Sequence, residues 1–356
     1  MLKIVSSPQD LNYSLSLPPL EVLTDQTEIT VEIRNTKDLT KIIISENYYP
    51  FDANTPLVLK YAGFIDILLS NSRPTGDKIT IQDKGVAEYE ITITAGTEAP
   101  LKSTFTVLKG FYYRQPIDLE FITATSWLNI ATLPQTVKTH QPVYLTAYPD
   151  EKVTVKVDCI FIDDKTMSLN YATLEALTLQ TLDVSAYLIQ QYSPKPLKRY
   201  TVYAVNAQGT VILKRQIFSV EQYDHSVDEF FVFQNRLGGF DSLVMSGEQK
   251  ETFKNETATA IMQEEYIVEY AGNRLRTVKK NTGYIQSRQH RQLLIDFIFS
   301  DKRFHVLDGA MRQINLKDPA IDPTKNALND FDIEFTYQDT MLAYPYIVQA
   351  PNFLKY

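Results

Sequence analysis

The stretch that divides this chain is EFFVFQNRLGGFDSLVM, residues Glu229–Met245. Phe231 and Phe233 lie two positions apart, as residues on one face of a β-strand do. Gly238 and Gly239 then interrupt the apolar pattern, and adjacent glycines allow the positive φ angles of a tight turn. The apolar pattern resumes after the glycines. We therefore predict a β-hairpin, with sandwich modules before it and a smaller α+β unit after it.

Two regions before this hairpin show the same order of alternating apolar and polar residues. Apolar side chains at every second position indicate strands with one buried face. The matching positions are Ile29, Val31 and Ile33 with Val153, Val155 and Val157; Ile65, Asp66 and Ile67 with Leu182, Asp183 and Val184; Tyr89, Ile91 and Ile93 with Tyr200, Val202 and Ala204; and Phe105 with Phe218. We predict a tandem repeat. Because few residues are identical between the copies, convergence on a common β-pattern is the alternative.

The predicted fold is mainly β, with two tandem Ig/fibronectin-like β-sandwich modules followed by a smaller α+β domain with one clear helix. At 356 residues the chain is longer than one hydrophobic core usually serves. We expect the first module, with an N-terminal arm or edge strand, at 1–112. The second module is expected at 113–222 and the C-terminal domain at 223–356.

The C-terminal domain contains one clear helical pattern and one clear strand pattern. Within Gln286–Ser300, apolar residues recur at helical spacing at Leu293, Leu294, Phe297 and Ile298. The last strand alternates at Phe331, Ile333, Phe335 and Tyr337. Between the hairpin and the helix we expect a polar run, SGEQKETFKNETATAI, and then a short strand at Tyr266–Tyr270.

The charge balance argues against nucleic-acid binding. The chain carries a net charge of −8 with a pI of about 5.2, whereas nucleic-acid affinity rests on clustered Lys and Arg. The exception is the cluster of Arg274, Arg276, Lys279 and Lys280, for which we predict a solvated strand end. No stretch has the length and hydropathy of a membrane span or a signal peptide. We expect no membrane insertion, and a location in the cytoplasm or in a particle assembled there.

No residue pattern indicates catalysis or cofactor binding. The four histidines are scattered, and the only cysteine, Cys159, lies in the segment VDCIFI, which predicts a buried small side chain. Neither a nucleophile motif nor a phosphate-binding glycine loop is present. We therefore expect no catalytic residue, no cofactor and no metal. A hydrolase with two facing carboxylates stays an alternative, because 43 acidic residues allow many pairs.

Acidic residues gather between 318 and 334, at Asp318, Asp322, Asp330, Asp332 and Glu334. Calcium loops of the EF-hand type place acids at alternate positions around a central glycine, which this segment lacks. Pro319 and Pro323 favour a loop that solvates its charges. The sequence leaves calcium binding by this segment open.

Trp127, the only tryptophan, lies in an aromatic-rich segment between the two modules. A large flat side chain stabilises a junction when buried, and it binds a sugar or a peptide when exposed on a platform. The residues that we expect at an interface or binding surface are Trp127, Phe231, Phe233, Asn235, Gly238, Gly239, Phe240 and Asp241. Backbone geometry explains the two glycines, and packing or a subunit interface explains the aromatic residues.

The segment NRLGGFDSL, Asn235–Leu243, resembles the N-x-x-G-G-(W/F)-(D/E) element of uncharacterised tail-associated (virion structural) proteins from bacteriophages and prophages of Bacteroidetes-type bacteria. Phe240 stands where Trp is more usual in that element. Three further segments resemble the same family in the same order, at Trp127–Tyr148, Thr282–Ser300 and Asp330–Thr340. The resemblance extends from about Phe121 to Tyr346 and its motifs are turns and core positions.

This resemblance implies a non-enzymatic structural component of a phage or prophage tail, associated with the tail tip or baseplate. Such a protein is made in the host cytoplasm and then becomes part of the virion. Its partners are other tail or virion proteins or further copies of itself. The alternative is a carbohydrate- or cell-surface-binding, adhesin-like β-sandwich protein, although the absence of a secretion signal weighs against it.

Overall fold

The computed structural model describes residues 2–112, 119–131, 134–261, 267–285, 287–319 and 330–338. The chain forms two compact units. Unit 1 comprises Met1–Thr136, Val143–Val220 and Asn235–Phe240, and unit 2 comprises Val137–Pro142, Glu221–Gln234 and Asp241–Tyr356. Strands in several sheets dominate and the described helices are short and few, so the predicted mainly β fold is confirmed. The module boundaries at 112 and 222 stay a prediction.

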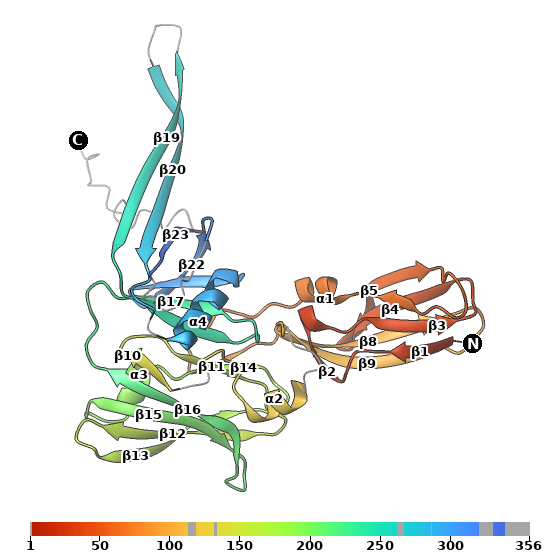
Figure 1. Cartoon of the computed structure of the whole chain (residues 1–356), viewed down its shortest axis with the longest axis horizontal. Coiled ribbons are helices and arrows are strands. Elements are labelled where there is room, and N and C mark those ends of the chain that lie inside the picture. The colour runs from red at the N-terminus through yellow and green to blue at the C-terminus, as the bar shows by residue number, and fades with distance from the viewer. Residues whose placement is uncertain are drawn as a thin grey trace, which may run out of the picture. The chain divides into compact units, whose positions relative to one another are not determined.

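The first sandwich of unit 1 consists of a five-stranded sheet in the order β2-β9-β8-β4-β5 and a three-stranded sheet in the order β1-β3-β6 (Figure 1). Its strands are β1 (Leu2–Ser6), β2 (Leu11–Tyr13), β3 (Leu20–Thr24), β4 (Ile29–Asn35), β5 (Asp38–Tyr48), β6 (Leu57–Leu59), β8 (Val86–Thr94) and β9 (Leu101–Leu108). The 3-10 helix η1 (Ser14–Ser16) follows β2, and α1 (Ala62–Leu68) follows β6. β1 and β2 are edge strands from the N-terminal region, as the edge-strand interpretation predicts, whereas β3 of the same region is the central strand of its sheet.

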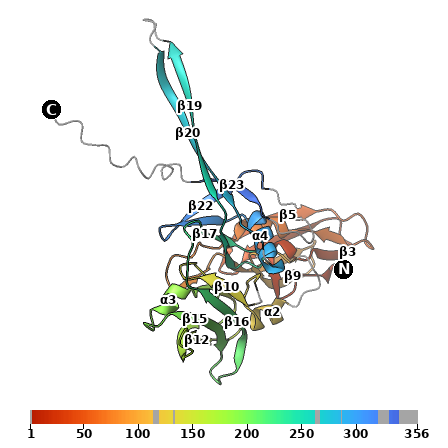
Figure 2. The same cartoon turned by 60° about the vertical axis from the view of Figure 1, so that its left-hand side comes forward.

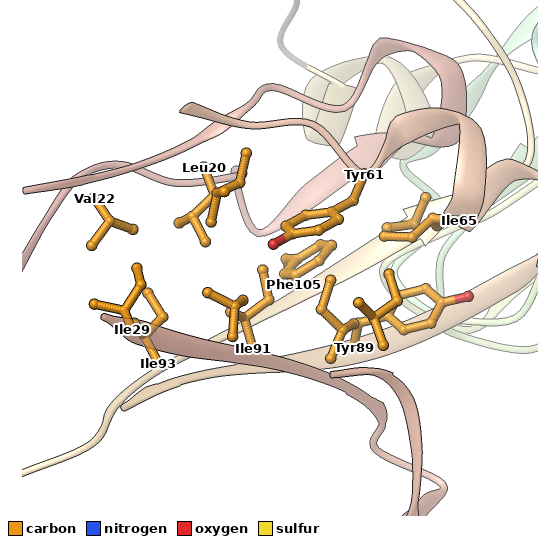
Figure 3. Close-up of a cluster of buried hydrophobic side chains, with 14 of the residues drawn as sticks. Leu20, Val22, Ile29, Tyr61, Ile65, Tyr89, Ile91, Ile93 and Phe105 are labelled. Carbon is orange, nitrogen blue, oxygen red and sulfur yellow. The ribbon is translucent and has the colours of Figure 1, made fainter. Parts of the chain in front are cut away.

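Apolar side chains from both sheets meet in the core of this sandwich (Figure 3). Leu20 and Val22 of β3 face Ile29 of β4 and Ile91 and Ile93 of β8, and each is at most 1% exposed. Burying one such side chain stabilises the fold by about 1.5–3 kcal/mol. The alternation in the sequence produces this core because every second side chain of a strand points to the same face.

The second sandwich of unit 1 has sheets in the orders β10-β16-β15-β12-β13 and β11-β14-β7 (Figures 1 and 2). Its strands are β7 (Ile79–Ile81), β10 (Gln135–Lys138), β11 (Tyr144–Ala147), β12 (Val153–Phe161), β13 (Thr166–Leu174), β14 (Gln180–Asp183), β15 (Leu197–Val205) and β16 (Val211–Glu221). Two short helices accompany them, α2 (Leu119–Thr125) and α3 (Ala186–Gln190). The Tyr171 hydroxyl of β13 donates a 2.8 Å hydrogen bond to the Asp183 carbonyl of β14, which links the two sheets.

Strand pairing confirms the sequence correspondence between the two sandwiches. The order β9-β8-β4-β5 in one sheet matches β16-β15-β12-β13 in the other. Corresponding cross-strand pairs are Ile33–Ile91 with Val157–Val202, and Tyr89–Phe105 with Tyr200–Phe218. The two aromatic pairs are also in ring contact, with centroids 6.0 Å and 4.8 Å apart. The repeated alternation therefore reflects a repeated arrangement of strands.

One part of the predicted correspondence is wrong. Asp66 lies in α1, whereas Asp183 is the last residue of β14. In each sandwich a strand and then a short helix occur in this order, so β6 corresponds to β14 and α1 to α3. A triplet of two apolar residues around an acidic one fits a strand and a helix equally well, because three residues do not resolve the two periods.

The strand β7 joins the two sandwiches. Ile79 and Ile81 lie between α1 and β8 in the sequence, and we expected them in the first sandwich. β7 instead pairs with β14, with Ile81 opposite Gln180 and Ile79 opposite Leu182. The first repeat therefore supplies an edge strand to the smaller sheet of the second. A period of two shows that a strand forms but not which sheet it joins.

Unit 2 contains a seven-stranded sheet in the order β18-β17-β21-β22-β23-β20-β19. Its strands are β17 (Glu229–Gln234), β18 (Phe240–Met245), β19 (Gln249–Ile261), β20 (Ile267–Asn281), β21 (Arg303–Leu307), β22 (Ala310–Leu316) and β23 (Asp332–Tyr337). The predicted helix is present as α4 (Arg288–Phe299), and the Ser287 hydroxyl caps it by accepting a hydrogen bond from the His290 amide. The predicted hairpin at Glu229–Met245 is also confirmed, as β17 and β18 are neighbours.

The hairpin of β19 and β20 is much longer than the strand that we predicted at Tyr266–Tyr270. Its strands pair from Gln249 opposite Lys280 to Ile261 opposite Ile267. The expected polar run is therefore mostly strand. A third strand, β23, pairs with β20 only over Thr277–Asn281, so the two strands extend past the rest of the sheet (Figures 1 and 2).

Lys280 is buried, which contradicts the predicted solvated strand end. Its side chain is fully inside unit 2, and the ammonium group donates hydrogen bonds to the backbone carbonyls of Val227 and Gly247. Burial lowers the pKa of Lys280. The neighbouring Lys279 is exposed as expected and forms a 2.7 Å ion pair with Asp332. Alternation explains the difference, because adjacent strand residues point to opposite faces.

Candidate interaction sites

The turn between β17 and β18 is fixed by the side chain of Asn235. Its amide oxygen accepts hydrogen bonds from the backbone amides of Leu237 and Gly239, at 2.9 and 3.0 Å. Its amide nitrogen donates to the Leu128 carbonyl at 2.9 Å. The Asn235 backbone pairs with that of Gly239, so one residue holds both ends of the turn. Asn is well suited because its short side chain can bond to the backbone two residues ahead.

The two glycines are required by close contacts with the backbone. Gly238 has a φ of +81°, and a Cβ there would lie 2.0 Å from the Lys109 carbonyl oxygen. A Cβ on Gly239 would lie 2.1 Å from the Leu128 carbonyl oxygen. Both distances are shorter than any real Cβ contact. The prediction that backbone geometry explains these glycines is therefore confirmed.

Further hydrogen bonds hold the rest of the turn inside unit 1. The Asn129 side chain donates to the Phe240 carbonyl at 2.9 Å and to the Tyr144 carbonyl at 3.0 Å. The Phe240 amide donates to the Thr146 hydroxyl at 3.2 Å. The Phe111 amide donates to the Arg236 carbonyl at 2.6 Å. Nearly every polar backbone group of the turn thus has a partner in the same unit, which leaves little for an external ligand.

Phe231 and Phe233 belong to an aromatic cluster in unit 2. Both rings contact Phe297 of α4 edge to face, with centroids 5.6 Å apart, and all three are fully buried. The Phe231 ring also stacks on His305, with centroids 4.7 Å apart. These contacts fix α4 on the face of the sheet and confirm packing as the explanation of the aromatic residues.

His305, which no sequence pattern singles out, bridges two strands of unit 2. Its Nε2 lies 2.7 Å from a Glu229 carboxylate oxygen, and its Nδ1 lies 2.8 Å from the Tyr337 hydroxyl. Burial raises the pKa of Tyr337 to about 12. With the imidazole fully buried, this chain of three polar groups satisfies its own hydrogen bonds, as buried polar groups must.

Trp127 is buried in unit 1 and only 5% exposed. Its indole nitrogen donates a 2.9 Å hydrogen bond to the Lys214 carbonyl of β16. The ring therefore packs against the second sandwich and offers no exposed face for a sugar or a peptide. This argues against the exposed platform, and the interpretation of Trp127 as a wedge at the junction stays a prediction.

All eight residues expected at an interface are buried in this structure, including Asp241. The structure divides them between unit 1, which holds Trp127 and the turn from Asn235 to Phe240, and unit 2. Their role at an interface with another subunit therefore stays a prediction, and within the chain they serve packing and the turn. Aromatic residues mark a core as readily as an interface, and the sequence does not show which neighbour covers them.

Exposed apolar residues occur elsewhere, beside α1 of the first sandwich. A groove of about 560 Å³ lies there, and its apolar lining comes from β5, α1 and β8. The lining residues that matter most are Ile42, Ile43, Phe64, Leu68, Val86 and Tyr89. Charged side chains, Lys37, Asp38, Asp83 and Lys84, also line it. The sequence signal for this site was the apolar run that begins at Phe64, which is too apolar for a solvated helix.

The described residues contain no group of three or more His, Cys, Asp and Glu side chains placed to hold a metal ion. Of the five acidic residues between 318 and 334, Asp322 lies outside the described residues, while Asp332 forms an ion pair with Lys279 and Glu334 one with Lys317. Cys159 is buried as predicted, and burial raises the pKa of its thiol to about 11. None of the helices in the described part of the chain combines the length and hydropathy of a membrane span.

Comparison with known proteins gives only distant structural likenesses. No protein-family model matches the chain, and no curated protein sequence matches it. Among solved structures, the Ig1–Ig2 crystal structure of DIP-gamma aligns with 63% of this chain and 98% of its own, at 10% identity and a TM-score of 0.20. The Ig1–2 module of the Drosophila receptor protein tyrosine phosphatase DLAR aligns with 62% and 98%, at 11% identity and a TM-score of 0.17. A complex of Dpr2 Ig1–Ig2 with DIP-Theta Ig1–Ig3 aligns with 96% and 91%, at 9% identity and a TM-score of 0.19. The mainly β assignment rests on the sheets described above, because TM-scores this low do not establish a shared fold.

Proposed function

We propose that this chain is a non-enzymatic assembly protein that acts by binding other protein chains, as a structural component of a phage or prophage tail. In this proposal it is made in the host cytoplasm and then becomes part of the virion, near the tail tip or baseplate. The observation that carries the proposal is the hairpin of β19 and β20.

The outer part of this hairpin is a two-stranded ribbon. From Arg276 outward β20 has no pairing with β23, whereas β19 and β20 stay paired as far as Ile261 and Ile267. An isolated two-stranded ribbon is marginally stable in water, and a third strand or a packed face is usually needed. A ribbon this long therefore favours a partner that covers it in the assembled state.

No described strand pairs with the outer edge of β19. It is the last strand of the seven-stranded sheet and contains 13 residues, more than twice the usual strand length. Unpaired amide and carbonyl groups along an edge are a template for pairing with another chain. Addition of a strand to such an edge is a common mode of protein recognition. We call the part of this hairpin from Lys254 to Leu275 the arm. The edge of β19 in the arm thus offers backbone groups for pairing with a neighbouring chain.

The tail assignment itself rests on the sequence resemblance at Asn235–Leu243 and at the three accompanying segments. The roles of Asn235, Gly238 and Gly239 support a structural interpretation of that motif, because each residue serves the turn. No reaction is needed to explain them. The proposal therefore concerns assembly alone.

A shortened arm tests the proposal. Phe253 and Arg276 face each other in the register, so Lys254–Leu275 can be replaced by Asn-Gly, which closes a two-residue hairpin. We expect loss of self-association or of binding to purified tails, measured by light scattering after gel filtration and by co-sedimentation. Circular dichroism should still show a folded β-protein, whose strand content falls only by the strand residues removed, because the two strands keep their supported base.

The control places Asn-Gly at Asp163 and Asp164, in the turn between β12 and β13, where β15 supplies a third strand. This variant should assemble like the wild type. Wild-type assembly by the shortened-arm variant would refute the role of the arm. A strictly monomeric wild-type protein, encoded at a locus without phage genes, would refute the tail assignment.

A further inference from the structure

Helix α1 is apolar on both of its faces. Ile65 is fully buried in the sandwich core and Leu69, just after the helix, is 3% exposed. On the outer side, Phe64 and Leu68 are each 45% exposed and Ile67 is 82% exposed. The one charged residue of the helix, Asp66, forms a 2.6 Å ion pair with Lys109, and a cluster of large apolar side chains exposed on the other side marks an interaction surface. Among the described residues, none covers the outer face of α1.

The groove beside α1 provides a place for that cover. Its volume of about 560 Å³ lies in the range of pockets that hold several large side chains. Phe64 and Leu68 of α1 line it, together with Ile42 and Ile43 of β5. β5 is the last strand of its sheet, so backbone groups for pairing lie next to the apolar lining. An extended apolar segment could fill the groove with its side chains and pair with β5 through its backbone.

The chain itself contains an apolar, uncharged stretch of sequence after its last described strand. Residues 341–354 read MLAYPYIVQAPNFL, with no charged residue and eight large apolar or aromatic side chains. Pro345 and Pro351 bracket the stretch YIVQA, and proline is tolerated at the ends of an added strand. Counted from Gln338, the segment can reach roughly 55 Å when extended, more than the diameter of a small domain.

We infer that residues 341–354 of a second copy of this chain dock in the groove between α1 and β5. This inference rests on the proposed assembly function and names one contact within the assembly. The uncharged segment covers Phe64, Ile67 and Leu68, and its large side chains fill the groove. Lys37, Asp38, Asp83 and Lys84 stay at the edge, where water can reach them.

Disulfide trapping in the full chain tests this contact. Leu68→Cys and Phe353→Cys are made as separate variants, mixed and oxidised. Cys159 is 1% exposed and stays unreactive in the folded protein. We expect a covalent dimer that joins one copy of each variant, seen on a non-reducing gel. The matched control is Phe299→Cys, an 80% exposed position in unit 2, which should not crosslink to Phe353→Cys.

Three results would overturn the inference. They are the absence of the mixed dimer, an equal yield with the Phe299→Cys control, and a crosslink that forms only when both cysteines are in one chain. Leu68→Asp gives a second measurement, since the half-exposed site tolerates a charge without unfolding. It should weaken self-association at least tenfold. Loss of association on shortening the arm, together with no effect of Leu68→Asp, would refute the groove contact and leave the proposed function intact.

Discussion

The β17–β18 hairpin and the β19–β20 hairpin follow one another in the chain, yet their backbone groups find different partners. The turn of the first, Asn235–Phe240, is surrounded by hydrogen bonds from Leu128, Asn129 and Thr146. Beyond Arg276 the second pairs, among the described residues, only through its own two strands. A hairpin that is fully satisfied within the chain serves folding. A hairpin with a long free edge is available to another chain.

The largest effect on stability should come from adding a methyl group in the turn Asn235–Phe240, which we call the locked turn. Gly238→Ala places a Cβ on the Lys109 carbonyl oxygen and strains a positive φ angle, so it should cost more than about 3 kcal/mol of unfolding free energy. Gly209→Ala is the matched control, because its φ is also positive, +82°, but no atom lies within 4 Å of the added Cβ. It should cost about 1 kcal/mol. Urea unfolding measures both, and equal losses would show that the close contact is unimportant.

The next effect concerns the side chain that fixes the turn. Asn235→Ala leaves the amides of Leu237 and Gly239 and the Leu128 carbonyl without their partner, which should cost about 2–4 kcal/mol. Asn206 makes the same kind of turn contacts, to Gln208 and Thr210, but in water. Asn206→Ala should therefore cost about 0.5–1 kcal/mol. Equal losses of unfolding free energy in the two variants would show that burial of Asn235 does not increase the cost of removing its hydrogen bonds.

A moderate effect on the stability of unit 1 should appear when the pH is changed. Burial raises the pKa of Asp183 in unit 1, the unit that holds the locked turn. Its Oδ2 has no hydrogen-bond partner among the described residues. Since the folded pKa lies above the unfolded value near 3.8, this contribution to stability is full below that pH. It is lost as the pH rises through the folded pKa.

Asp183→Asn should remove this pH dependence while its amide oxygen keeps the acceptor role toward Ser185. Four tyrosines lie near this carboxyl, Tyr144, Tyr171, Tyr187 and Tyr200, and burial raises the pKa of each, so they stay neutral. Fluorescence of Trp127, the only tryptophan, reports the unfolding of unit 1 between about pH 4 and about pH 8. A variant as pH-dependent as the wild type would exclude Asp183 as the cause.

The smallest effect on stability should come from the arm. Replacing Lys254–Leu275 by Asn-Gly removes only backbone pairs that have no third strand, so the melting temperature of the isolated chain should change by less than about 2 °C. Scanning calorimetry measures this. A fall comparable to that of Gly238→Ala would show that the arm stabilises the fold of its own chain, and the contrast between the two hairpins would be lost.

The sequence predicted those elements whose pattern repeats. Alternation at Ile29, Val31 and Ile33 predicts β4 because every second side chain is buried, and the spacing of Leu294 and Phe297 predicts α4 for the same reason. The length of β19 could not be predicted, since its sequence is polar and its pairing is with its own neighbour. The burial of Lys280 depends on carbonyls more than thirty positions away. No local pattern shows those contacts.

The candidate sites were harder to predict than the fold. The motif around Gly238 drew attention because it is unusual, but its glycines are needed by Lys109 and Leu128, which are far away in the sequence. The groove beside α1 draws its lining from three separate elements. Only the apolar run at Phe64 hinted at it. A site made by distant segments leaves little trace in any one of them.

The strand β7 has a consequence for how this chain can be inherited. Because β7 of the first repeat pairs with β14 of the second, a recombination event that moved the second repeat alone would leave the edge of β14 open. Open edges favour aggregation, so such a fragment would be selected against. The two repeats can be told apart in the sequence, but we expect them to be inherited together and to be gained or lost as a pair.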